Sequence, residues 1–68
     1  MMRPLISCVV PVHNGERHLE EALDSILAQE WRPIQVIVVD DGSTDRTLTL
    51  AREVAERAPE LIVVSQSN

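Results

Sequence analysis

The stretch VIVVDDGSTD, residues 36–45, decides the fold. Four apolar residues run directly into two adjacent carboxylates, Asp40 and Asp41, and a glycine, two hydroxyl residues and a third acid follow within four positions. A short run of β-branched residues closed by Gly, Ser and Asp is typical of a buried strand that ends in a turn. The sequence therefore places the carboxyl end of a strand at the pair of acids.

Two further apolar runs flank this strand in the chain. LISCVVPV, residues 5–12, and LIVVS, residues 61–65, both read as strands. The strand between them is IQVIVV, residues 34–39, and it carries apolar side chains on both faces, which predicts a central position in a sheet.

Residues 16–29 and the segment that ends at Ala58 show helical spacing of apolar residues. Asn14 is expected to cap the first helix and Ser43 or Thr44 the second, because short polar side chains satisfy free N–H groups at helix starts. The residues expected to face inward are Leu19, Ala22, Leu23, Ile26 and Leu27 in the first helix, and Leu48, Ala51, Val54, Ala55 and Ala58 in the second.

Strands and helices therefore alternate as β-α-β-α-β, which predicts the α/β class with a three-stranded parallel sheet and right-handed crossovers. In such a sheet, ligands bind beyond the carboxyl ends of the strands, where loops lead into helices. His13, Asn14 and Glu16 follow the first strand, and Asp40 and Asp41 end the second. We expect these side chains to approach one another on one rim.

Composition narrows the function classes. The chain has 68 residues, a net charge of -5 and no run of Lys or Arg, so neither nucleic acid nor an anionic membrane is an expected partner. Its apolar runs are too short for a signal peptide or a spanning helix, which predicts a cytoplasmic location. The single cysteine, Cys8, is expected to be an inert buried thiol.

Several known site types fail on particular residues. The first strand is followed by His13-Asn14-Gly15 and not by G-x-G-x-x-G, and the chain has no lysine for a P-loop. A phosphatase-type loop needs a nucleophilic Asp where Val39 stands. Plainer interpretations also stay open: Asp40 and Asp41 as capping and turn residues, His13 as an ordinary loop histidine, and Trp31 as a packing lid.

Two separated motifs carry a family resemblance. ISCVVPVHNGERHLEEALDSILAQ followed by IQVIVVDDGSTDRT resembles the N-terminal segment of family 2 glycosyltransferases of the GT-A fold, whose pattern is close to V-V-I-P-V-Y-N, then S-I-L-x-Q, then V-I-V-V-D-D-G-S-x-D. The resemblance covers almost the whole chain. It implies a Rossmann-like N-terminal half of a GT-A fold with the strands in the order 3-2-1.

The resemblance also implies roles for five residues in holding the nucleotide of a sugar donor. Asp41 accepts a hydrogen bond from the base, usually from N3 of uracil, whose N–H is flanked by two carbonyl acceptors. Asp40 secures the loop or contacts the ribose, and Pro11 lines the base pocket. His13 stands where the family commonly has Tyr and keeps a planar group beside the base. Glu16, at the start of the first helix, is the weaker assignment.

By the same resemblance, residues 1–68 form a single partial domain, the donor-nucleotide-binding half of an inverting enzyme that takes a nucleotide-sugar, UDP-sugar in particular, and transfers the sugar to an acceptor hydroxyl. Family members hold Mg or Mn through a D-x-D motif and use a downstream carboxylate as base. Neither motif precedes Asn68. We therefore expect no catalytic residue, no metal bound by this chain's own residues, and no transfer activity from the 68 residues alone.

The alternative is a non-catalytic α/β module that associates with itself or binds a partner. With strand order 3-2-1, right-handed crossovers put both helices on the same face of the sheet and leave the other face bare. The first strand is then an unpaired edge. Both features predict a homo-oligomer, most simply a two-fold dimer, formed through the bare face or the edge.

Overall fold

The computed structural model describes residues 4–30 and 32–67, so the expectation that Trp31 is a packing lid lies outside the described residues. Strands and helices alternate along the chain, which confirms the α/β prediction. The elements are β1 (Ile6–Val12), α1 (Leu19–Leu27), β2 (Ile34–Asp41), α2 (Thr47–Arg57) and β3 (Leu61–Gln66).

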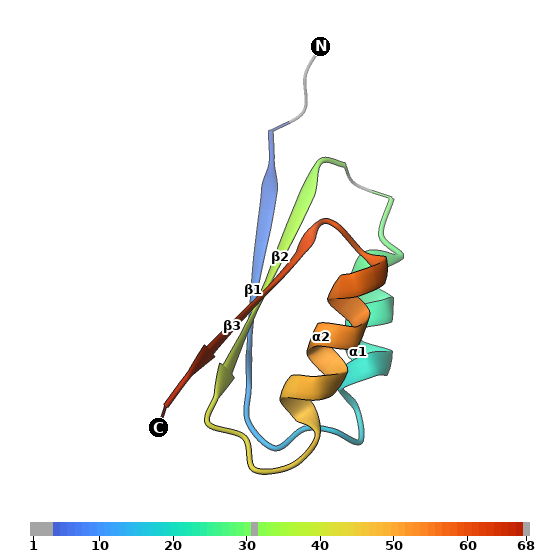
Figure 1. Cartoon of the computed structure of the whole chain (residues 1–68). Helices are drawn as coiled ribbons and strands as arrows, with labels where there is room; N and C mark the ends of the chain where they lie inside the picture. The colour runs from blue at the N-terminus through green and yellow to red at the C-terminus, as the bar shows by residue number, and fades with distance from the viewer. Residues whose placement is uncertain (1–3, 31, 68) are drawn as a thin grey trace.

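The three strands form one parallel sheet with β2 in the centre. Its order, β1-β2-β3, is the order 3-2-1 read from the opposite edge. Val9, Ile37 and Ile62 share one cross-strand row. Both helices lie against the same face of the sheet (Figure 1), so the carboxyl ends of β1 and β2 and the starts of both helices meet at one end of the molecule.

The core lies between β2 and the helices. Alternate residues of β2 point to opposite faces, as a strand's period of two requires: Ile34, Val36 and Val38 are buried, whereas Ile37 and Val39 are half-buried. The helices therefore cover only one face of the central strand. The buried hydrophobic residues are Leu19, Leu23, Ile34, Val36, Val38, Ala51, Val54, Ala58 and Leu61.

Two expectations about inward-facing residues were wrong. Leu48 is only half-buried, and its neighbour Thr47 is fully buried instead. The Thr47 hydroxyl is held inward by hydrogen bonds with Gly15 N and the Asp45 carboxylate. Ala22 is exposed because α1 extends beside β1, whose outer edge has no partner strand among the described residues.

Both helices begin later than expected, and their expected caps are used elsewhere. The residue before α1 is His18 and the residue before α2 is Arg46, and neither makes a side-chain capping bond. Asn14, Ser43 and Thr44 bond across the loops instead. Long-range hydrogen bonds have replaced the local caps that the sequence favours.

Neither helix covers the opposite face of the sheet (Figure 1), and apolar side chains are exposed on it. Val9 in β1 is 61% exposed, and Ile62 and Val64 in β3 are each 43% exposed. Cys8 is half-buried and not fully buried as expected, because β1 lies at the edge of the sheet. Within residues 4–30 and 32–67, no helix has the length and apolar character needed to cross a lipid bilayer.

A matched pair of valines tests this one-sided core. We expect Val36→Ala, on the covered face, to lower the free energy of unfolding by about 2 to 3 kcal/mol, the worth of a buried valine side chain plus the cavity that it leaves. In solutions dilute enough that the chain is monomeric, Val9→Ala, in the neighbouring strand on the open face, should change it by less than about 0.5 kcal/mol, because Val9 is exposed in the monomer. Urea unfolding followed by circular dichroism measures both, and equal losses would contradict a core confined to one face.

Candidate functional site

Two loops lie side by side at the carboxyl end of the sheet (Figure 1). The first rim loop, residues 13–18, joins β1 to α1, and the second rim loop, residues 42–46, joins β2 to α2. Residues about thirty positions apart in the chain are hydrogen-bonded across them. The sequence correctly predicted that the residues following β1 and ending β2 come together on one rim: His13, Asn14, Glu16, Asp40 and Asp41.

Asn14 connects the two rim loops through both its backbone and its side chain. Its N–H donates to Ser43 Oγ (2.9 Å), and its Oδ1 accepts from Thr44 N (2.8 Å). Asn14 has a positive φ of 50°, a conformation that asparagine tolerates better than most residues. The turned backbone points the next N–H, of Gly15, at Thr47 Oγ1 (2.9 Å).

Glu16 and Asp45 form a reciprocal pair between the rim loops. Glu16 N donates to Asp45 Oδ2, and Arg46 N donates to Glu16 Oε2, each over 3.3 Å. Asp45 Oδ1 also accepts from Thr47 N (2.9 Å) and from the Thr47 hydroxyl. Each carboxylate thus binds backbone of the opposite loop, and Asp45 in addition satisfies an N–H at the start of α2.

The Asp45 carboxylate is stabilised in its charged form. The hydrogen bond from the Thr47 hydroxyl is the main cause that lowers the pKa of Asp45; desolvation opposes it, and the bonds from the Thr47 and Glu16 backbone N–H groups each lower the pKa by less. Because Asp45 accepts all of these bonds as an anion, protonating it would weaken the contact between the loops.

Asp40 points to the helix side of the sheet and is only 1% exposed. Its carboxylate accepts hydrogen bonds from the hydroxyl and the backbone N–H of Ser43, three positions ahead. Asp40 thereby closes the turn that carries Gly42, whose φ is 66°. The structure places this acid beneath the second rim loop, where it holds the loop.

Asp41 points to the opposite, open face, because successive side chains of a strand alternate, and it is half-buried. The Asp41 backbone carbonyl accepts a hydrogen bond from His13 Nδ1 over 2.7 Å. A carbonyl oxygen can only accept, so Nδ1 carries the proton and Nε2 faces Asn14 Nδ2 at 3.4 Å as an acceptor. The imidazole of His13 is therefore fixed next to Asp41.

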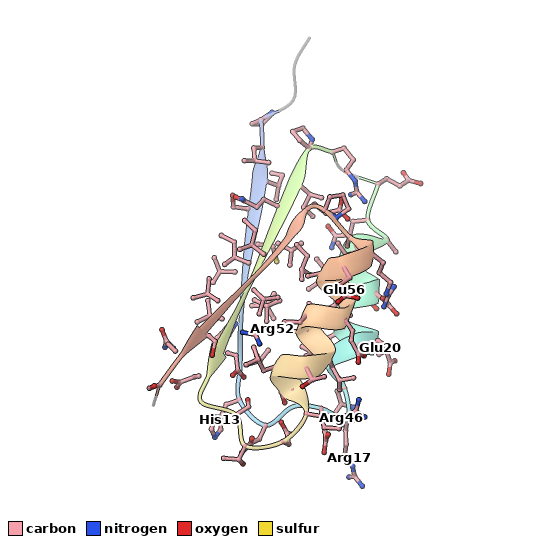
Figure 2. The ribbon with its side chains drawn as sticks, in the orientation of Figure 1. His13, Arg17, Glu20, Arg46, Arg52 and Glu56 are labelled. Carbon is pink, nitrogen blue, oxygen red and sulfur yellow. The ribbon has the colours of Figure 1, made fainter. Side chains whose placement is uncertain are left out.

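Pro11 lies on the same open face as His13, two residues earlier in β1. It is in register with Val39, which precedes Asp41 by two positions. Pro11, His13 and Asp41 consequently form one group on the open face, whereas Asp40 and Glu16 serve the loops. Figure 2 shows His13 at the carboxyl end of the sheet, away from the charged side chains of the helix layer such as Glu20 and Glu56.

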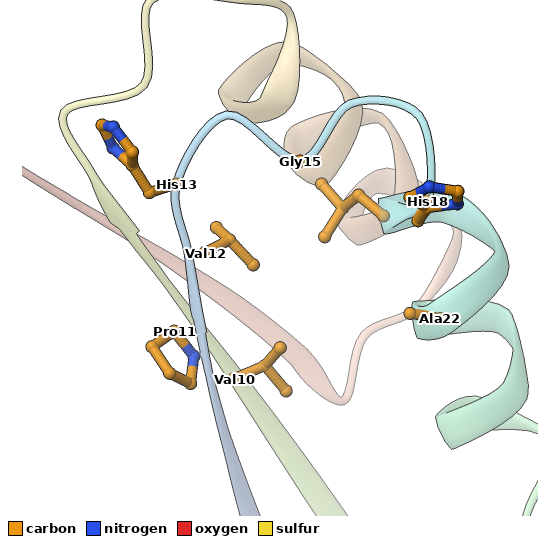
Figure 3. A pocket seen from close by; sticks show the side chains of 8 residues that line it. Val10, Pro11, Val12, His13, Gly15, His18 and Ala22 are labelled. Carbon is orange, nitrogen blue, oxygen red and sulfur yellow. The ribbon is translucent and has the colours of Figure 1, made fainter.

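A cavity of about 280 Å³ lies on the helix side, between β1 and α1. Val10 and Val12 point into it, whereas Pro11 and His13 point away on the other side of the strand (Figure 3). Asp41 is not among the residues that line this cavity, although Pro11 and His13 border it. The residues that line it are Val10, Pro11, Val12, His13, Gly15, His18, Leu19 and Ala22.

In the described part of the chain, no group of three or more His, Cys, Asp or Glu residues could hold a metal ion. The acids of the rim are spread over both faces of the sheet and over the loops, and the hydrogen bonds above engage Asp40, Asp45 and Glu16. What the rim offers instead is one carboxylate on the open face beside a fixed imidazole.

Sequence reasoning missed three residues of the rim. Asp45 and Thr47 belong to a D-x-T pattern just before a helix, and Asp is a favoured residue at helix starts, so a local signal for them existed. Gln66, whose Nε2 donates to Asp41 Oδ1 over 3.5 Å, carried no such signal. Its role depends on the register of β3, which places it opposite Asp41.

The lowered pKa of Asp45 predicts a pH dependence of stability. A carboxyl group whose pKa is lower in the folded than in the unfolded chain stabilises the fold above its ordinary pKa of about 3.9, and that contribution is lost as the pH falls through the folded value. We expect Asp45→Asn to be less stable than the wild type at pH 7, with the difference shrinking on acidification below about pH 4.

Urea unfolding at a series of pH values measures this. Thr47→Val removes the hydroxyl bonded to Asp45. Like Asp45→Asn, it should lower the free energy of unfolding more at pH 7 than at acid pH. A difference between wild type and Asp45→Asn that stays constant from neutral to acid pH would contradict the account of the rim loops.

Comparison with known proteins places this geometry in a family. The model for the family described as glycosyl transferase family 2 matches residues 7–68. An uncharacterized glycosyltransferase of Bacillus subtilis, EpsJ, is 40% identical over 67 residues, which are 98% of this chain and 20% of that protein. The glycosyltransferase GlyA of Streptococcus pneumoniae is 38% identical over 63 residues, 93% of this chain and 9% of that protein.

A solved structure agrees in fold as well. The mannosyltransferase PcManGT from Pyrobaculum calidifontis, in complex with GDP-Man and Mn²⁺, superposes with a TM-score of 0.80 at 36% identity, over 98% of this chain and 20% of that chain. The present chain thus spans about a fifth or less of the length of these proteins. On the family match and on these relatives, the chain belongs to glycosyltransferase family 2, as its sequence motifs implied.

Proposed function

We propose that this chain binds the nucleotide part of a nucleotide-sugar donor at the open-face side of the rim, with Asp41 accepting a hydrogen bond from the base. The arrangement around Asp41 supports the proposal. The Asp41 side chain lies half-buried on the open face, and its backbone carbonyl accepts a hydrogen bond from His13 Nδ1 over 2.7 Å. The neighbouring Asp40 carboxylate is already hydrogen-bonded to Ser43. Asp41 is the acid of the pair that remains for a ligand.

A carboxylate selects a base by its ring N–H, because it can accept but not donate. Uracil offers N3–H and guanine N1–H, whereas cytosine and adenine have a bare acceptor at the corresponding ring nitrogen. The family resemblance favours a UDP-sugar, and PcManGT was solved with GDP-Man. We take uracil as the first ligand and guanine as the competing one, and both fit an acceptor at Asp41.

The other assigned residues support the base in different ways. The fixed imidazole of His13 offers a planar face, and Pro11 offers an apolar surface on the same side of β1. Asp40 and Glu16 act at a distance from the base, by holding the second rim loop and by joining it to the first. Their roles in nucleotide binding are therefore to keep the rim in shape.

In the whole protein we propose an inverting transfer of the sugar to an acceptor hydroxyl. A divalent cation, Mg or Mn, would supply positive charge that stabilises the diphosphate leaving group. Since the described residues include no cluster able to hold it, its ligands would come from other parts of a protein of the relatives' length. The Mn²⁺ in the PcManGT complex supports this assignment.

Replacing Asp41 by asparagine tests the proposal. We expect Asp41→Asn to weaken UDP binding by about 1 to 3 kcal/mol, because the asparagine amide can place a donor against the N–H of the base. Isothermal titration calorimetry of the 68-residue chain with UDP measures the difference.

The control for this experiment is Asp24→Asn, which changes charge equally at an acid on α1 that pairs with Arg57 over 3.1 Å. It should leave the UDP affinity unchanged. Equal UDP affinities of the wild type and Asp41→Asn, or no UDP or GDP binding by the wild type, would refute nucleotide binding through Asp41.

A second proposal concerns self-association, because the open face is apolar. Across it run two rows in register, Val9, Ile37 and Ile62 in one and Pro11, Val39 and Val64 in the other. By strand alternation, no charged side chain lies in or between these rows. Two copies could pack these faces together without opposing like charges. We propose that a second copy of the chain covers the open face in solution.

Light scattering at micromolar concentration tests this. The wild type should weigh about two chains of 7.6 kDa, and Val9→Lys, which places a charge in the centre of the face, should shift the chain to monomer. Thr49→Lys, on the exposed side of α2, is the matched control and should remain dimeric. A wild type that is monomeric, or a Val9→Lys variant that is still dimeric, would overturn the proposal.

A further inference from the structure

The side chain next to Asp41 on the open face is Gln66, the last residue of β3. The sheet register pairs Asp41 with Gln66, and Gln66 Nε2 donates to Asp41 Oδ1 over 3.5 Å. Asp41 is half-buried and Gln66 is exposed. A ligand that reaches the carboxylate from solvent therefore meets the amide at the same time.

The contact with Asp41 decides which way the Gln66 amide faces. A carboxylate only accepts, so the NH₂ group and not the carbonyl oxygen of Gln66 must lie beside it. An amide NH₂ has two hydrogens, and one of them serves Asp41 Oδ1. The second hydrogen stays available for a ligand, so the two side chains together present an acceptor and a donor side by side.

We propose that Gln66 is a specificity-determining residue, a proposal that rests on nucleotide binding at Asp41. Gln66 holds the Asp41 carboxylate in place and donates its second N–H to the carbonyl beside the ring N–H of the base. That carbonyl is O4 in uracil and O6 in guanine. Cytosine and adenine carry an amino group at this position, which would set donor against donor.

The pair thus reads two adjacent atoms of the base and not one. Asp41 requires a ring N–H, and Gln66 requires a neighbouring C=O, so the pair selects the lactam bases, uracil and guanine. A site that hydrogen-bonds a group of its ligand rejects an analogue lacking that group, because the polar atoms of the site are then left unpaired. Loss of Gln66 should accordingly relax the choice of base as well as weaken binding.

Calorimetric titration of the 68-residue chain with UDP, GDP, CDP and ADP tests this. We expect Gln66→Leu to weaken UDP and GDP binding about fivefold, the worth of one net hydrogen bond. The affinities for CDP and ADP should stay unchanged. The ratio of UDP affinity to CDP affinity should therefore fall about fivefold. Gln66→Glu, which keeps the shape but sets an acceptor against Asp41 and against the carbonyl, should weaken UDP binding more than tenfold.

Gln35→Leu is the matched control, because Gln35 lies on the same face at the opposite end of β2. It should bind all four nucleotides as the wild type does. Gln66→Leu and Gln35→Leu should both retain the circular dichroism spectrum of the wild type and unfold at similar urea concentrations.

The outcomes separate this inference from the proposed function. UDP binding that Asp41→Asn weakens and Gln66→Leu does not would overturn the role of Gln66 and leave nucleotide binding intact. A uniform loss for all four nucleotides in Gln66→Leu would show a purely structural effect and would also overturn it. A wild type that binds neither UDP nor GDP would refute the proposed function, and the role of Gln66 with it.

Discussion

The pairing of β2 with a strand on each side fixes the directions of the Asp40 and Asp41 side chains. Because β2 is held in register with β1 and β3, its alternation cannot slip, and a slip by one residue would exchange the two faces. The helices cover one face only, so the even positions 34–40 are buried and the odd positions look to the open side. Two adjacent acids at the end of such a strand must then have different surroundings: Asp40 is buried beneath the second rim loop, and Asp41 faces solvent beside His13.

The strands, their parallel order and the meeting of both loops on one rim could be predicted from the sequence, because each depends on local apolar patterns and on the handedness of crossovers.

The starts of the helices could not be predicted from the sequence. Asn14 and Ser43 look like local caps, but their hydrogen bonds reach across about thirty residues of sequence. A local signal cannot show whether such a distant partner will compete for the same side chain. The same limit hid Thr47, whose buried hydroxyl is satisfied only because Gly15 and Asp45 reach it.

The site divides in a way that the family pattern alone does not show. Pro11 and His13 are among the residues that line the cavity between β1 and α1, but their side chains point to the other face of the strand, away from Val10 and Val12 (Figure 3). Nucleotide recognition is proposed for the open face, where Asp41, His13 and Gln66 offer polar atoms next to apolar rows. Ligand binding is proposed at the carboxyl end of that face and self-association across its centre. Pro11 belongs to both regions, but the two proposals can be tested separately because Asp41 and Gln66 belong only to the first and Val9 only to the second.

The pleat of β2 gives its two terminal acids separate tasks. The most direct test of this division is a side-by-side measurement of urea unfolding and UDP affinity for Asp40→Asn and Asp41→Asn. We expect Asp40→Asn to lose about 1 to 3 kcal/mol of stability, because a buried amide is mispaired against the Ser43 N–H. While folded, it should lose less UDP affinity than Asp41→Asn does. Asp41→Asn should show the reverse, with near-normal stability and weakened UDP binding. A loss of UDP affinity confined to Asp40→Asn, or similar effects of both variants on both quantities, would contradict this division of tasks.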